Sequence, residues 1–295
     1  MLPYLLLGGA QLAVGAAAIF ARFALGGAQP IAVAAGRLTI AALVLLLASA
    51  VRPTRAKLAP RARTILFFAG AAMAIHFATW IGSLDFTNIA VSTLLVTTTP
   101  IWTAAYDAIV LRRGLSRPAL YAFIAGGVGL VMVVGFDRTP PPFRGHDLLG
   151  AGLALAGAVA IGAYFTLVRE VRSELSTRTI VTHTYGWASL GLLVAAAAAR
   201  QPLPAPSAAG AWGGILAMAL ISQLLGHTAL NAALRWFSPS AVAFATLLEP
   251  AIAAALALAI FHEAVPPLAI AGGIILLGSI AVVLREDRTG FGPTL

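Results

Sequence analysis

Residues 246–284 read TLLEPAIAAALALAIFHEAVPPLAIAGGIILLGSIAVVL, and this stretch decides the class of the whole chain. It holds two long apolar runs that only a short turn, HEAVPP at 262–267, interrupts. An α-helix needs about 20 mostly apolar residues to cross the roughly 30 Å hydrocarbon layer of a bilayer. The runs at 240–261 and 265–284 meet that requirement, so the pattern predicts a pair of antiparallel membrane helices.

The rest of the chain repeats this pattern. Of its 295 residues 60% are hydrophobic and 10% are charged, and the mean hydropathy is +0.94, whereas globular domains are about half apolar and a quarter charged. We therefore predict an all-α integral membrane protein with ten transmembrane helices. The predicted spans lie near 3–25, 30–51, 64–85, 90–111, 118–136, 147–168, 179–199, 210–232, 240–261 and 265–284. The longest connections, 52–63 and 136–147, are too short to bury a core of their own.

The basic residues predict the orientation of these spans. With the N-terminus in the cytoplasm, fourteen of the 19 Lys and Arg residues fall in inner loops or the inner tail, three fall in outer loops, and Arg22 and Arg37 lie within helices. This excess predicts that both termini are cytoplasmic. We expect a multi-pass protein of a bacterial inner (plasma) membrane. The net charge of +9 then reflects topology and not nucleic-acid binding, because no loop interleaves aromatic and basic residues.

The second half of the chain echoes the first at a displacement of 150–151 residues. The matching pairs are FTNIAV at 86–91 with FSPSAV at 237–242, His76 with His227, and Pro100 with Pro250. Gly126-Gly127 and Gly272-Gly273 then mark the fifth span of each half, after slightly different loop lengths. An odd number of spans in each half inverts the second half in the membrane, as in many secondary transporters. We expect two five-helix domains, 1–141 and 142–295, joined by a proline-rich linker.

Three segments of the second half resemble the EamA-type drug/metabolite transporters: LEP at 248–250, HEA at 262–264 and IAGGIILLG at 270–278. The first half carries a weaker copy, with Thr99-Pro100 in place of the Glu-Pro pair and GGVG at 126–129. The first helix departs from the family, which often has a tryptophan-glycine pair where this chain has AIF at 18–20. The resemblance implies two inverted five-helix repeats around a central cavity and the export or exchange of small metabolites.

This resemblance favours a secondary transporter that exports small metabolites by alternating access, with amino acids, aromatic ones included, as the favoured substrates. A multidrug or nucleotide-metabolite exporter of the same fold is an alternative, and so is a membrane-embedded enzyme. An enzyme would need clustered histidines or acidic residues, which this chain scatters. We expect a monomer or weak dimer in a lipid bilayer, with a small-molecule substrate, no cofactor and no metal. His262-Glu263 is followed by Pro266 where a zinc-binding HExxH motif requires histidine.

The candidate substrate-binding residues are Arg37, His76, Trp80, Thr98, Trp102, Trp187 and Glu249. Ionisable groups deep in a bilayer are expensive to insert, so those retained normally face protein or water. Arg37 could hold a carboxylate with two parallel hydrogen bonds, and Glu249 could bind an amino group or a proton. Alternatively, the two pair with each other, or Glu249 satisfies backbone groups freed by Pro250. Arg22 lies nearer a helix end, where its side chain can reach the interface.

The other candidates are aromatic, hydroxyl-bearing or imidazole side chains placed in the middle of a span. His76 precedes Trp80 by one turn, so both can face one side of the third helix. Trp102 follows Pro100 closely in the fourth span and is the tryptophan most readily placed in a cavity. Tyr185 and Trp187 cannot share a helix face, and we favour Trp187 as the more deeply placed. The run TTT at 97–99, which contains Thr98, either lines a polar path or bonds its own backbone.

Overall fold

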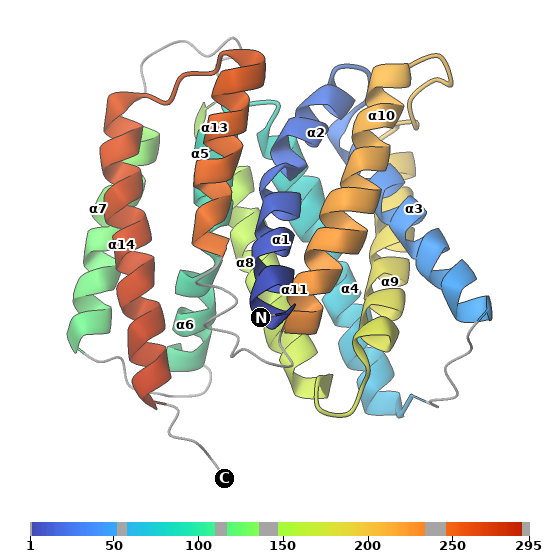
Figure 1. Cartoon of the computed structure of the whole chain (residues 1–295), viewed down its shortest axis with the longest axis horizontal. Coiled ribbons are helices and arrows are strands. Elements are labelled where there is room, and N and C mark those ends of the chain that lie inside the picture. Colours follow the sequence, from blue (N-terminus) through green and yellow to red (C-terminus); the bar gives the residue numbers. More distant parts are fainter. Residues whose placement is uncertain (1, 52–57, 110–116, 136–146, 234–245, 291–295) are drawn as a thin grey trace.

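The computed structural model describes residues 2–51, 58–109, 117–135, 147–233 and 246–290, and every element in these ranges is helical (Figure 1). The helices are α1 (Leu2–Gly15), α2 (Ala17–Leu25), α3 (Pro30–Val51), α4 (Pro60–Ser83), α5 (Ile89–Val96), α6 (Thr99–Ile109), α7 (Arg117–Gly135), α8 (Asp147–Val171), α9 (Thr177–Ala198), α10 (Ala209–Ala217), η1 (Met218–His227), α11 (Thr228–Ala233), η2 (Thr246–Leu248), α13 (Glu249–Phe261) and α14 (Pro267–Gly290). A π-helix forms η1, and η2 is a 3₁₀ turn. Proline begins α3, α4 and α14, a position where its missing N–H would have had no helical partner.

All ten predicted spans coincide with apolar helices. Those long enough to cross a membrane are Leu5–Leu25, Pro30–Val51, Pro60–Ser83, Leu148–Val171, Thr177–Ala198 and Ala209–Ala233. Shorter apolar helices at Ile89–Thr103, Leu120–Gly129, Glu249–Phe261 and Pro267–Ser279 occupy the other four predicted spans. The predicted all-α membrane fold is confirmed. The beginning of the ninth span at 240–245, the motif at 237–242 and the predicted domain boundary at 141/142 lie outside the described residues.

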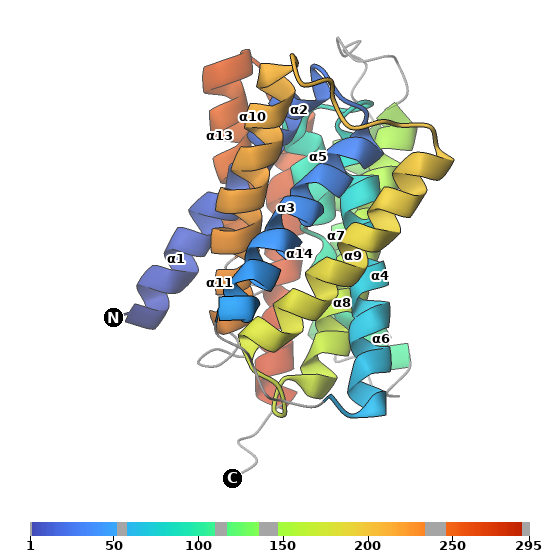
Figure 2. The same cartoon turned by 90° about the vertical axis from the view of Figure 1, so that its right-hand side faces the viewer.

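The packing of the helices follows the predicted repeat. Helices α3, α5 and α7 of the first half each pack against their own counterparts in the second half, α9, α13 and α14. The other contacts between the halves also correspond. The third span of the first half, α4, packs along the first span of the second half, α8. Likewise the third span of the second half, α10–η1, packs along the first span of the first half, α1 and α2. A two-fold axis that relates inverted repeats produces this pattern. The α7–α14 pair forms one edge of the molecule in Figure 1, and the α3–α9 pair forms the opposite edge, which faces the viewer in Figure 2.

Glycine allows the last helices of the two halves to touch. A Cβ atom added to Gly129 of α7 would lie 2.7 Å from the carbonyl oxygen of Gly272 and 2.9 Å from the amide nitrogen of Leu276, both on α14. No larger residue fits this approach without movement of backbone. Small residues at such contacts are typical of membrane helices, where lipid provides no hydrophobic drive for association.

Two helices of the bundle begin in the middle of their predicted spans, at equivalent places. Helix α6 begins at Thr99, directly before Pro100, and α13 begins at Glu249, directly before Pro250. The preceding α5 ends at Val96, so the fourth span is a broken helix. Discontinuous helices at matching positions of two inverted repeats are a frequent feature of transporter substrate sites.

Candidate substrate site

The pseudo-two-fold axis passes through a contact between α3 and α9. The hydroxyls of Thr39 and Ser189 lie 2.7 Å apart, and these residues are separated by 150 positions, which is the displacement of the repeat. A contact between equivalent residues is expected only near the axis. Arg37 lies two residues before Thr39 on α3, so the charged candidate from the second helix is close to the axis.

Arg37 is fully buried. Its Nε donates a hydrogen bond of 2.9 Å to Oε1 of Gln223 in η1, a residue of the second half. Its Nη1 and Nη2 are buried and make no hydrogen bond to any residue that the structure describes. Arg37 and Glu249, both among the described residues, make no ion pair with each other, so the expected alternative of an Arg37–Glu249 pair is excluded.

Aromatic rings surround this guanidinium. The Arg37 Cζ atom lies 3.9 Å from the ring centroid of Phe77 and 5.9 Å from that of Trp80, a geometry that stabilises a cation. His76 stacks on Trp80 with an interplanar angle of 5° and a centroid separation of 6.2 Å, which confirms that both face one side of α4. His76 also lies 2.9 Å through Nδ1 from the carbonyl oxygen of Gly157 on α8. The Nε1 of Trp80 is buried and has no hydrogen-bond partner in the described part of the chain.

The second half contributes hydroxyl, amide and imidazole groups to the same region. His227, the repeat counterpart of His76, packs edge-on against Phe77 with centroids 5.5 Å apart. The buried Tyr185 hydroxyl lies 3.3 Å from that of Thr228, and the Tyr164 hydroxyl donates to Oδ1 of Asn231 at 3.3 Å. Arg37, His76 and Trp80 are thus brought together with residues of η1, α9 and α11.

Thr98 and Trp102 lie together on the broken fourth span. The Trp102 Nε1 donates to Oγ1 of Thr98 at 3.0 Å, while the Thr98 hydroxyl itself donates to the Leu95 carbonyl. The hydroxyls of Thr97 and Thr99 likewise bond to carbonyls three residues earlier. All three threonines therefore satisfy the backbone that the helix break leaves open. Trp102 is 36% exposed.

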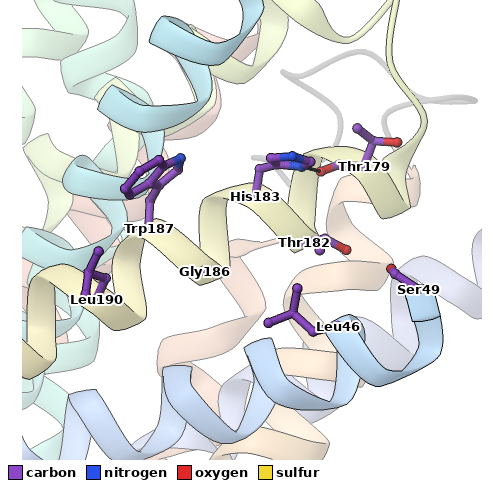
Figure 3. Close-up of a pocket in the computed structure, with 8 residues that line it drawn as sticks. All are labelled: Leu46, Ser49, Thr179, Thr182, His183, Gly186, Trp187 and Leu190. Carbon is purple, nitrogen blue, oxygen red and sulfur yellow. Dashed lines mark hydrogen bonds between the residues drawn. The ribbon is translucent and has the colours of Figure 1, made fainter. Parts of the chain in front are cut away.

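Trp187 lies on a different surface, a groove between α3 and α9. The groove has a volume of about 470 Å³, and Figure 3 shows Trp187, His183 and Leu190 of α9 beside Leu46 and Ser49 of α3. Trp187 is 41% exposed and packs edge-on against Phe67 of α4. The structure thus buries Tyr185 in the central region and turns Trp187 away from it, although the sequence favoured Trp187.

Glu249 begins α13, directly before Pro250, and is half-buried. Among the described residues its carboxyl group makes no hydrogen bond and no ion pair. A carboxylate in the first turn of a helix interacts favourably with the helix dipole. This placement supports the structural role for Glu249, and its partial exposure leaves a binding role open to experiment.

One end of the bundle, uppermost in Figure 1, is tied across the two halves. An ion pair joins Arg22 Nη1 at the end of α2 to Glu263 Oε1 after α13 at 3.1 Å, with both side chains 12% exposed. Glu263 Oε2 also accepts the backbone N–H of Ile89 at the start of α5, and Arg22 Nη2 donates to the Thr87 carbonyl. His262, with φ of 57°, ends α13 in a left-handed cap that sets the direction of Glu263. Protein groups of both halves therefore hold the Arg22 side chain at this end of the bundle.

Sequence reasoning missed Gln223 and Tyr185. Gln223 was visible as the one amide in the apolar run GGILAMALISQLLGH at 213–227. Its importance depends on the π-helical turn that carries it against α3, which hydropathy does not reveal. Tyr185 was weighed against Trp187 by depth alone, and depth does not identify the face of a helix that meets the neighbouring half.

Two interlocked, inverted five-helix repeats with a buried polar region on their axis define a membrane protein with the architecture of a secondary transporter. The model of the EamA-like transporter family matches residues 1–135 and 148–285 of this chain, once for each repeat. The chain belongs to the EamA-like transporter family. The resemblance seen in the LEP, HEA and glycine-rich segments is thereby confirmed, and the family is one of transporters and not of enzymes.

Individual proteins are also similar to this chain, a yeast membrane protein and a solved structure among them. An uncharacterized vacuolar membrane protein of Saccharomyces cerevisiae is 36% identical over 121 residues, a match that covers 37% of this chain and 30% of the yeast protein. The chain therefore matches less than a third of that relative's length. A solved crystal structure is 16% identical over 98% of this chain and 99% of its own, with a TM-score of 0.67. That likeness shows the fold over the whole chain.

Proposed function

We propose that this chain is a secondary transporter that exports small metabolites by alternating access, with amino acids, aromatic ones among them, as its main substrates. The observation that carries this proposal is the buried region on the pseudo-two-fold axis, where Arg37, Trp80 and Gln223 meet. A membrane protein keeps charged and polar groups at this depth at a cost, usually for a substrate or ion path. The region combines a cation with aromatic rings, as an aromatic amino acid requires.

The ion pair of Arg22 and Glu263 supports the proposed mechanism. It connects the first half to the second at one end of the bundle, and that end is the outer one in the orientation that the basic residues predict. Rocking of the two halves would break this connection and expose the central region to the outer side. The same orientation, with both termini in the cytoplasm of a bacterium, is part of the proposal.

Reconstitution tests the proposal directly. Purified protein in liposomes is expected to carry labelled phenylalanine, tyrosine or tryptophan across the bilayer faster than empty liposomes. Competition by unlabelled amino acids, nucleotides and lipophilic cations distinguishes amino-acid export from multidrug or nucleotide-metabolite export. Absence of protein-dependent flux for all three amino acids contradicts the proposed substrate class, and flux unaffected by an imposed pH gradient indicates facilitated diffusion in place of proton coupling.

A further inference from the structure

Three buried hydrogen-bond donors of the central region have no acceptor among the described residues. They are Nη1 and Nη2 of Arg37 and Nε1 of Trp80. The Oε1 of Gln223 accepts from the third nitrogen of the Arg37 guanidinium, Nε. A fully buried guanidinium without an acidic partner is strongly unfavourable, so such groups are normally paired.

The neighbouring residues fix the guanidinium without neutralising it. Phe77 lies 3.9 Å beneath Cζ and sets the plane of the group. Gln223 holds Nε, and its own Nε2 lies 4.0 Å from the Met73 sulfur. Gln223 is positioned by the π-helical segment η1, where the adjacent Ser222 hydroxyl donates to the Ala13 carbonyl of α1 at 2.8 Å. Short π-helical segments occur frequently at functional sites.

We propose that Arg37 and Trp80 form a subsite for the carboxylate of the substrate and that Gln223 is its positioning residue. This inference rests on the proposed function and narrows it to substrates that bear a single carboxylate. Two parallel N–H groups of one guanidinium match a carboxylate, and one positive charge matches one negative charge. The subsite requires a neutral amide at position 223, because a carboxylate there would be a permanent counter-ion of Arg37 in place of the substrate carboxylate.

The test compares two ligands that differ only in the carboxylate, L-tryptophan and L-tryptophanamide, as competitors of labelled phenylalanine flux in proteoliposomes. The wild-type protein is expected to prefer tryptophan by about tenfold to 100-fold, the usual effect of losing charged hydrogen bonds. Gln223→Glu keeps the size of the side chain and neutralises Arg37, and it is expected to abolish this preference. Gln201→Glu makes the same change at a half-buried glutamine whose Oε1 accepts the Ile31 N–H, and it is expected to keep the preference.

Each result decides the inference. Equal competition by the acid and the amide in a wild-type protein that carries phenylalanine overturns the carboxylate subsite while leaving the transporter intact. A Gln223→Glu protein that retains the wild-type preference overturns the role of Gln223. If Gln223→Glu fails to accumulate, Arg37→Lys provides the second variant, since it keeps the charge, removes the paired N–H groups and is expected to reduce the preference. No flux of any amino acid counts against the proposed function itself.

Discussion

Removal of the charge on Glu263 is expected to open the end of the bundle that the Arg22–Glu263 pair closes. The variant Glu263→Gln keeps an oxygen that can accept the Ile89 N–H, so the start of α5 stays capped while the ion pair is lost. The change is therefore directed at the connection between the halves and not at the fold of either half.

The magnitude follows from the burial of the pair. Both side chains are 12% exposed, and removal of one partner from a buried pair costs about 3–5 kcal/mol. The Thr87 carbonyl and the charge of Asp85 partly compensate Arg22, so we expect the closed state to lose about 1–3 kcal/mol. At about 1.4 kcal/mol for each factor of ten, the population open at this end rises about fivefold to 100-fold.

The absence of cysteine from the chain makes the assay simple, because a single introduced thiol reports alone. Ser92 of α5 is fully buried and lies one turn beyond Ile89, so Ser92→Cys reacts with a membrane-impermeant maleimide only when this end opens. We expect faster labelling from the outer side in the Glu263→Gln background. The matched control is Glu170→Gln, which breaks the exposed Arg61–Glu170 pair and is expected to leave the rate unchanged, because exposed pairs contribute about 0–1 kcal/mol. Equal labelling rates with and without Glu263→Gln would refute the reasoning.

Three further predictions concern packing and flux. Gly129→Val is expected to lower the unfolding temperature in detergent by forcing α7 from α14 at a cost of about 1–3 kcal/mol, while Gly127→Ala, with no atom within 4 Å of its Cβ, stays near the wild-type temperature. His76→Ala and Trp102→Ala are expected to reduce flux while folded protein remains in the membrane, and wild-type rates in both would make these residues structural. Glu249→Gln is expected to remove about 0.3–1 kcal/mol of favourable interaction between the carboxylate and the helix dipole. If the flux of this variant responds to a pH gradient as the wild-type flux does, Glu249 is excluded as the proton carrier.

Most of the fold could be predicted from the sequence because apolar length and repetition are properties of the chain itself. The match of Pro100 with Pro250 predicted equivalent places in the two halves, and a helix begins directly before each proline in the structure. The break that precedes α6 was not predicted, because the apolar run continues through it. The π-helix η1 was not predicted.

The candidate site was predicted less completely, for a physical reason. Charge and depth identified Arg37, and the helical period placed His76 with Trp80. The rotation of each helix about its own axis decides which remaining candidates join them, and in an Ala- and Leu-rich helix no amphipathic pattern reports that rotation. Trp187 therefore lies in the groove between α3 and α9, while Trp102 pairs with Thr98 at the break of the fourth span. The roles of all seven candidates in transport stay predictions.

The scaffold is symmetric, but its chemistry is not. At the displacement of 150 that relates Thr39 to Ser189, the counterpart of Arg37 is Trp187, which faces the groove and carries no charge. In the proposed cycle a carboxylate held by Arg37 stays with the first half throughout, whereas Gln223 moves with the second. The Arg37–Gln223 hydrogen bond crosses between the halves, so any rocking must stretch or remake it. One guanidinium, that of Arg37, would then hold both a hydrogen bond to the moving half and a hydrogen bond to the substrate. Binding of substrate to the site would thereby be physically connected to motion of the bundle.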